Sequence, residues 1–262
     1  MTQHYHYALA VQYAGGDFSG WQRQPDVATV QGALESALSS IANEAISLSS
    51  AGRTDAGVHA TAQIAGFTSS VAPDQRNWRR ALNALTVDSI RVTWVCQVAA
   101  DFHPRYSATS RRYTYVFYDH QQDDPFVHHL AWCCEPLDAD FMHRQAQQLL
   151  GEHDFSSFRG AGCQSLSPNR RVDQVWVYRR RGFVVMEIEA NAFLLHMVRN
   201  IASALRDLGR GANEHDLSVL LEQRDRAAVG ATAPPQGLYL SRVRYPDVEL
   251  PPVSEAPAIL LG

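Results

Sequence analysis

The chain has 262 residues, of which 45% are hydrophobic and 19% charged, and its formal net charge is −4. This composition fits a globular chain long enough for two domains. Because no run of about 18 apolar residues occurs, the sequence excludes a membrane-spanning helix. The first six residues lack the basic and apolar segments of a signal peptide, so a cytoplasmic location is expected.

Cysteine and lysine usage narrow the chemistry further. The cysteines form no C-x-x-C pair, so reduced thiols are expected and neither a zinc site nor a disulfide framework is. They are Cys96, Cys133, Cys134 and Cys163. No lysine occurs, and all 23 basic residues are arginines. A lysine Schiff base and a P-loop lysine are thereby excluded, and any nucleic-acid contact must use guanidinium groups.

The charges are separated along the chain. Residues 51–112 carry eight arginines and four carboxylates, and residues 159–181 carry six arginines and one carboxylate. Between them, residues 113–158 carry eight carboxylates and one arginine. This separation permits a basic, nucleic-acid-binding face on an acidic protein.

Hydrophobic periodicity predicts the elements of the first half. Alternating residues predict a strand over 5–13, a glycine- and glutamine-rich loop follows over 14–26, and Thr29 has the side chain of a helix N-cap. A helix opened by Pro73 would carry Trp78 on its apolar face. Further strands are expected over 46–50, 61–68 and 90–98.

The second half repeats this order. A helix capped by Asp138 is expected after the first strand, and the remaining elements are strands over 111–119, 172–178, 183–189 and 238–244 and helices over 192–208 and 214–222. Two β-α-β-β-α-β units predict an α/β (α+β) fold with two ferredoxin-like domains, 1–105 and 106–246, followed by a surface tail over 247–262. Their antiparallel sheets would join into one extended sheet, a surface of the kind that RNA-binding domains use.

One loop concentrates reactive side chains. Residues 51–60 place Arg53 and Asp55 between Gly52 and Gly57, with strands expected on both sides. Loops held on a rigid scaffold are common places for function. The alternative is structural, with Asp55 capping a turn and Arg53 pairing with it.

Three further residues have both a structural and a functional interpretation. Tyr113 is a typical packing residue of a strand, but the two arginines before it favour an anion-facing position. Leu238, on the last expected strand, either packs in the core or lines the functional site. Arg199 lies on an apolar helix and therefore needs a carboxylate, for which the candidates are Glu187, Glu189 and Asp55.

Several other site types have no sequence support. The chain contains no G-x-x-x-x-G-K-[ST], G-x-G-x-x-G, H-E-x-x-H or G-x-S-x-G motif. The pairs His128-His129 and His4-x-His6 are too weakly spaced to indicate a metal site.

From Tyr7 to Tyr245 the sequence resembles the tRNA pseudouridine synthase A family. The segments that carry the resemblance are 13–22, 51–59, 102–113, 154–159, 163–165, 191–194, 197–200 and 237–240. The resemblance implies the pseudouridine synthase fold, a homodimer without cofactor, and conversion of uridine to pseudouridine at positions 38 to 40 of the tRNA anticodon stem-loop.

The resemblance also implies residue roles. The catalytic aspartate falls on Asp55, the active-site tyrosine on Tyr113, the arginine that pairs with the carboxylate on Arg199, and an RNA-handling arginine on Arg53. Leu238 is expected to bind substrate. Two alternatives stay open, a non-catalytic tRNA-binding module and a synthase with another RNA target, as does the choice between nucleophile and base for Asp55.

Overall fold

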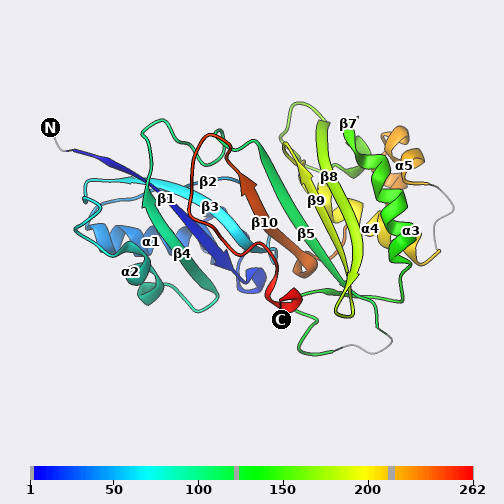
Figure 1. Ribbon diagram of the computed structural model, residues 1–262, viewed down its shortest axis with the longest axis horizontal. Coiled ribbons are helices and arrows are strands. Elements are labelled where there is room, and N and C mark those ends of the chain that lie inside the picture. Colours follow the sequence, from blue (N-terminus) through cyan, green and yellow to red (C-terminus); the bar gives the residue numbers. More distant parts are fainter. Residues whose placement is uncertain (1–2, 121–123, 212–215, 262) are drawn as a thin grey trace. The chain divides into compact units, whose positions relative to one another are not determined.

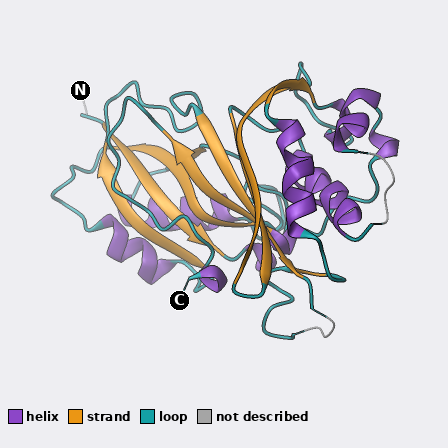
Figure 2. Cartoon of the chain, turned by 45° about the vertical axis from the view of Figure 1, so that its right-hand side comes forward, coloured by secondary structure: helices purple, strands orange, loops and turns teal. Residues whose placement is uncertain are grey.

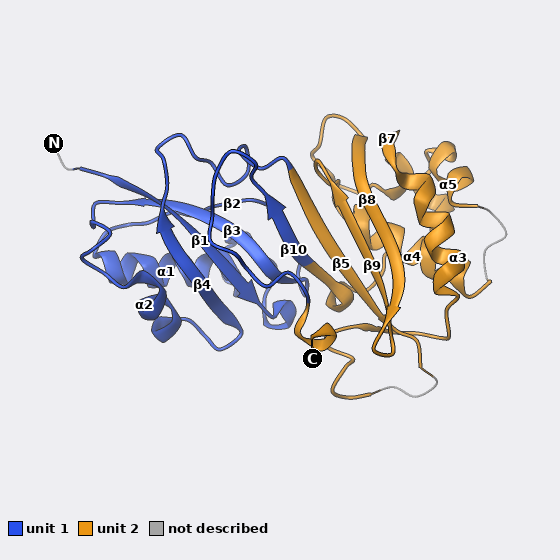
Figure 3. Ribbon diagram, viewed as in Figure 1, with its two compact units in different colours: residues 1–109, 240–256 blue, residues 110–239, 257–262 orange. Residues whose placement is uncertain are grey.

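The computed structural model describes residues 3–120, 124–211 and 216–261. It divides into two compact units: unit 1 consists of Met1–Thr109 with Leu240–Ala256, and unit 2 of Ser110–Tyr239 with Pro257–Gly262 (Figure 3). Both contain helices and mostly antiparallel strands. Unit 1 has the predicted β-α-β-β-α-β order, whereas unit 2 has additional short strands and a further helix, and the strand expected over 238–244 is divided between the two units. The mixed α/β fold class is thus confirmed.

In unit 1, β1 (Tyr5–Tyr13) lies between β4 (Ile90–Gln97) and β3 (His59–Ser69) and is antiparallel to both. The short β2 (Ser49–Ser50) and β10 (Leu238–Arg244) also border β3. Helices α1 (Val30–Ala42) and α2 (Trp78–Leu85) cover one face of this sheet, and a 3₁₀ turn, η1 (Gly15–Asp17), follows β1 (Figure 1).

In unit 2, the strand order is β5-β9-β8-β7, and the three helices gather on one face of the sheet (Figure 2). The strands are β5 (Ser110–Tyr118), β6 (Trp132–Cys133), β7 (Gly151–Asp154), β8 (Asn169–Arg180) and β9 (Phe183–Ala190). The helices are α3 (Ala139–Ala146), α4 (Met197–Gly209) and α5 (Leu217–Gln223), with 3₁₀ turns η2 (Gln147–Leu149), η3 (Ser156–Phe158), η4 (Arg226–Ala228), η5 (Pro235–Gly237) and η6 (Ala258–Leu260).

Two predicted helix caps are confirmed. The Thr29 hydroxyl accepts a hydrogen bond from Gly32 N at 3.3 Å at the start of α1. The Asp138 carboxylate accepts one from Phe141 N at 2.9 Å at the start of α3. Each cap satisfies a backbone donor that the helix itself leaves unpaired.

Three expected boundaries are wrong: the start of α2, the extent of the strand over 46–50 and the start of α4. Helix α2 begins at Trp78 and not at Pro73, because Asn77 accepts from Arg80 N at 3.1 Å and caps it there. The strand expected over 46–50 is reduced to β2, because Glu35 and Ser39 side chains bind the N–H groups of Leu48 and Ile46. The start of the helix expected over 214–222 lies outside the described residues.

The start of α4 depends on the backbone conformation of one residue. The helix expected over 192–208 begins only at Met197. His196 before it has φ +60°, a left-handed conformation that a helix cannot include, and Gly160 packs against its ring. The segment before α4 is therefore an irregular loop.

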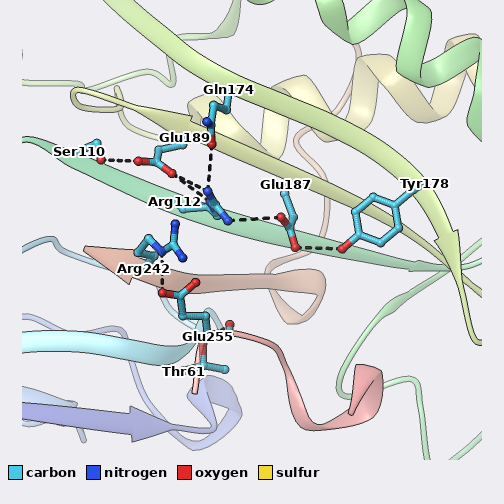
Figure 4. Close-up of polar contacts among 9 residues, drawn as sticks. All are labelled: Thr61, Ser110, Arg112, Gln174, Tyr178, Glu187, Glu189, Arg242 and Glu255. Carbon is cyan, nitrogen blue, oxygen red and sulfur yellow. Dashed lines mark hydrogen bonds and ion pairs between the residues drawn. The ribbon is translucent and has the colours of Figure 1, made fainter. Parts of the chain in front are cut away.

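The segment after residue 246 packs on the rest of the chain. Leu250 and Val253 lie against the apolar cluster of Ala10, Ala51 and Ile64 in unit 1. Arg242 pairs with Glu255 at 2.5 Å, and Glu255 O accepts from the Thr61 hydroxyl at 2.8 Å (Figure 4). In unit 2, Leu260 is buried beside Val116 and Tyr239.

Candidate active site

The loop that carries Asp55 is fixed at the residue before it. Thr54 is buried, its hydroxyl lies 2.8 Å from the Tyr13 hydroxyl, and its carbonyl accepts from Trp21 N at 3.0 Å. The Asp55 carbonyl accepts from Val58 N at 3.1 Å and closes a turn. Asp55 is half-buried and Arg53 is exposed. The backbone around the carboxylate is therefore held on both sides.

Two glycines allow the segment after β1 to approach this loop. A Cβ on Gly15 would lie 2.0 Å from Val58 O, and a Cβ on Gly20 would lie 2.8 Å from Thr54 O. Gly20 also has φ +94°, which L side chains rarely adopt. Gly15 N donates to His59 Nδ1 at 3.0 Å, which fixes that nitrogen as an acceptor. The glycine-rich composition of residues 14–26 is the sequence signal that could have indicated this support.

Tyr113 is a buried residue of β5, 9% exposed, and its ring meets Phe193 edge-on at 5.1 Å. Arg112, the residue before Tyr113, has different partners. Arg112 donates to Glu189 at 2.8 Å and lies 3.6 Å from Glu187 (Figure 4). Because successive side chains of a strand point to opposite faces, Arg112 and Tyr113 lie on opposite faces of β5. Glu187 and Glu189 therefore neutralise the Arg112 charge within unit 2.

Arg199 lies in the first turn of α4 and is half-buried. Its Nε donates to Ala233 O at 2.7 Å. Of its candidate partners, Glu189 binds the Ser110 hydroxyl at 2.5 Å as well as Arg112, and Glu187 accepts from the Tyr178 hydroxyl at 2.9 Å. Both glutamates therefore have structural roles around Arg112.

The segment from 229 to 238 is anchored by buried polar groups that sequence reasoning missed. Arg226 donates to Val229 O and, through Nη2, to Asn200 Oδ1 at 3.1 Å. Asn200 is fully buried next to Arg199, and its Nδ2 donates to Phe158 O at 2.8 Å. The partners lie 26 and 42 residues apart, so no local pattern could have indicated them.

Tyr115 fixes the end of this segment, where Leu238 begins β10. The Tyr115 hydroxyl donates to Pro234 O at 2.8 Å, and a Cβ on Gly237 would lie 2.7 Å from the Tyr115 ring. Burial raises the pKa of Tyr115 well above its ordinary value, so the hydroxyl remains a donor at physiological pH. Leu238 itself is buried, 5% exposed.

The sequence was compared with known proteins. A family model described as tRNA pseudouridine synthase matches residues 9–107 and 145–246. A tRNA pseudouridine synthase A of Coxiella burnetii (strain Dugway 5J108-111) is 45% identical over 97% of this chain and 98% of its own. One of Shewanella sp. (strain MR-4) is 46% identical over the same shares. This chain belongs to the tRNA pseudouridine synthase family.

As a member of the tRNA pseudouridine synthase family, the protein is an RNA isomerase, and the resemblance is confirmed. The five predicted site residues are divided between the units. Asp55 and Arg53 belong to unit 1, whereas Tyr113, Arg199 and Leu238 belong to unit 2.

In residues 3–120, 124–211 and 216–261, no three His, Cys, Asp or Glu side chains are grouped to hold a metal ion. Over the same part of the chain, no helix is long and apolar enough to cross a membrane.

Proposed function

We propose that this synthase converts uridine to pseudouridine at positions 38, 39 and 40 of the tRNA anticodon stem-loop. The observation that carries the proposal is the clamped carboxylate loop, in which Tyr13 and Trp21 hold Thr54 beside Asp55. Chemistry at one sugar atom requires a reacting group that is fixed in this way. The relatives' names support tRNA as the substrate.

The proposed reaction needs no net oxidation. The bond between uracil N1 and C1′ breaks, a bond between C5 and C1′ forms, the C5 proton leaves and N1 gains a proton. Substrate and product are isomers, so electrons balance without a redox cofactor. Asp55 acts at the sugar, as nucleophile or as base.

Arg199 and Tyr113 complete the proposed site. The family resemblance assigns the carboxylate-pairing role to Arg199, and we propose Asp55 as the carboxylate with which it pairs. This ion pair would keep Asp55 ionised and aimed. Tyr113, braced by Phe193, would stack on the uracil and help to remove the C5 proton.

Arg53 and Leu238 are assigned to RNA. A stem base must leave its stack before it can react, at a cost of a few kcal/mol. Exposed Arg53 would offset this cost by contacting phosphate, and Leu238 would contact the substrate. We further propose that the enzyme works as a homodimer in the cytoplasm.

Tritium release tests the reaction and its position together. Unmodified tRNA labelled with tritium at uridine C5 is incubated with the wild-type enzyme in EDTA. The proposal predicts tritium release and pseudouridine mapped to positions 38 to 40. Tight tRNA binding without release would instead favour a non-catalytic binding module, and release that maps elsewhere would favour another RNA target.

A further inference from the structure

Two arginine side chains converge on one residue of the loop 159–168 in unit 2, between η3 and β8; Arg159 begins this loop and Arg170 is the second residue of β8. Arg159 Nη2 donates to Ser165 O at 2.7 Å and to Cys163 O at 2.7 Å. Arg170 Nη2 donates to the hydroxyl of the same Ser165 at 2.6 Å. One serine therefore holds both guanidinium groups, one through its carbonyl and one through its hydroxyl.

No carboxylate of the described chain forms an ion pair with either group. The remaining partners of Arg170 are the carbonyls of Ser167, at 3.0 Å, and Asn169, at 2.5 Å. Neighbouring Arg171, in contrast, pairs with Asp173 at 2.7 Å. Neutral oxygens orient the two guanidinium groups but leave both positive charges uncompensated.

The pKa values of neighbouring groups reflect the positive charge of these arginines. Burial lowers the pKa of Arg170; the Cys163 thiol acts to raise it, and the nearby charge of Arg159 acts to lower it. Burial acts to raise the pKa of the Cys163 thiol, but N–H groups of Leu195 and Ser165 and the Arg159 guanidinium outweigh it, and the net shift is downward. Burial raises the pKa of the Cys96 and Cys134 thiols. Cys163 thus lies where an anion is favoured.

The loop is both accessible and fixed. Leu166 at its tip is fully exposed, and nothing lies within 4 Å of a Cβ built on Gly162. Gly160 N donates to Leu195 O at 2.7 Å, which ties the loop to the segment that leads into α4. An anion bound by the loop would therefore lie in the same unit as Arg199, near the positive end of the α4 dipole.

We propose that Arg159 and Arg170 form a binding site for a phosphate of the RNA backbone. The assignment of that phosphate to RNA rests on the proposed function. Paired guanidinium groups with fixed donors suit the tetrahedral oxygens of phosphate and read no base sequence. The site holds the RNA beside the end of α4 that carries Arg199.

The first test is the tRNA affinity of Arg170→Gln at several salt concentrations. We expect Kd to rise about fivefold to twentyfold and the salt slope, d log K/d log[salt], to fall in magnitude by about one. Arg144→Gln is the matched control, because Arg144 lies exposed on α3 over the Phe141 ring, at 5.6 Å. Wild-type Kd and slope in Arg170→Gln would overturn the site.

A second variant protects the test against misfolding. Arg170→Lys keeps the charge and loses the planar fork, so we expect the wild-type salt slope with Kd raised about threefold. An Arg170→Lys protein that folds and matches wild type in Kd would contradict the two-arginine geometry.

Cys163 provides a readout that needs no substitution in the site. Iodoacetamide labelling of the Cys163 peptide, measured by mass spectrometry, should slow at least fivefold when tRNA is bound. Millimolar inorganic phosphate at the same ionic strength should leave the rate unchanged. Equal protection by inorganic phosphate would mean a free-phosphate site and would overturn the RNA assignment, as would no protection by tRNA.

These measurements separate this site from the proposed function. Binding and labelling require no turnover. If wild type releases no tritium but Arg170→Gln still binds tRNA weakly, the proposed reaction fails and the phosphate site stands. If wild type makes pseudouridine and Arg170→Gln binds normally, the phosphate site fails alone.

Discussion

Thr54 makes the geometry of the Asp55 loop depend on distant residues. Its hydroxyl binds Tyr13 at the end of β1, and its carbonyl binds Trp21 in the loop after β1, whereas Asp55 precedes β3. Side chains that act on substrate are usually aimed by such supporting contacts. The support, rather than Asp55 itself, sets how accurately the carboxylate is placed.

The close approach of Gly20 to Thr54 gives a prediction. Gly20→Ala would place a Cβ 2.8 Å from Thr54 O at φ +94°. We expect a loss of about 1–3 kcal/mol in the free energy of unfolding and a lower kcat, because the loop must shift. Thermal unfolding measures the change in stability, and steady-state kinetics measure the change in kcat.

Gly16→Ala is the matched control. Nothing lies within 4 Å of a Cβ built on Gly16, and its φ is not positive. Wild-type stability and kcat are expected for it. If Gly16→Ala loses as much stability and kcat as Gly20→Ala, the whole segment after β1 is sensitive to substitution and the contact with Thr54 is not the cause.

At the scale of elements, the loop from 229 to 234 depends on Arg226. The guanidinium binds Val229 O, Gly230 O and Thr232 Oγ1, and it also reaches buried Asn200 on α4. This network links the helix of Arg199 to the segment that ends at Leu238. A loop without its own secondary structure is stabilised here by side-chain hydrogen bonds.

Arg226→Gln should therefore release the loop. We expect a loss of about 2 kcal/mol in unfolding free energy, because buried Asn200 and the loop carbonyls lose a hydrogen-bond donor. Limited proteolysis should cut within 229–234. Arg224→Gln, whose side chain is 68% exposed, should change stability by less than about 0.5 kcal/mol. Resistance of Arg226→Gln to both measurements would contradict the network.

The elements that could be predicted from sequence are those specified locally. Thr29 and Asp138 cap their helices through contacts three residues away. The start of α4 was misplaced because the conformation of His196 is coupled to Gly160, which is distant in sequence. The candidate residues were indicated by local motifs and family resemblance. The contacts that support the loops around these candidates, Tyr13 with Thr54 and Asn200 with Arg226, are tertiary contacts that no local pattern encodes.

At the scale of the whole molecule, the absence of lysine limits how RNA can be bound. Every side-chain cation that holds its charge above neutral pH is one of the 23 arginines. Acetylation of amines should modify only the N-terminal amine and leave the Kd for tRNA unchanged within about twofold. Phenylglyoxal, which modifies arginine, should abolish binding. Loss of binding after acetylation alone would contradict an arginine-only surface.

The central claim is that Asp55 reacts with the substrate and does not only bind RNA. The most direct measurement compares tritium release and tRNA affinity for Asp55→Asn and for Asp88→Asn, an exposed carboxylate with the same change. We predict that Asp55→Asn loses at least about 10²–10⁴-fold in rate with Kd within threefold of wild type, while Asp88→Asn keeps both. Tritium release by Asp55→Asn at the wild-type rate would contradict the account.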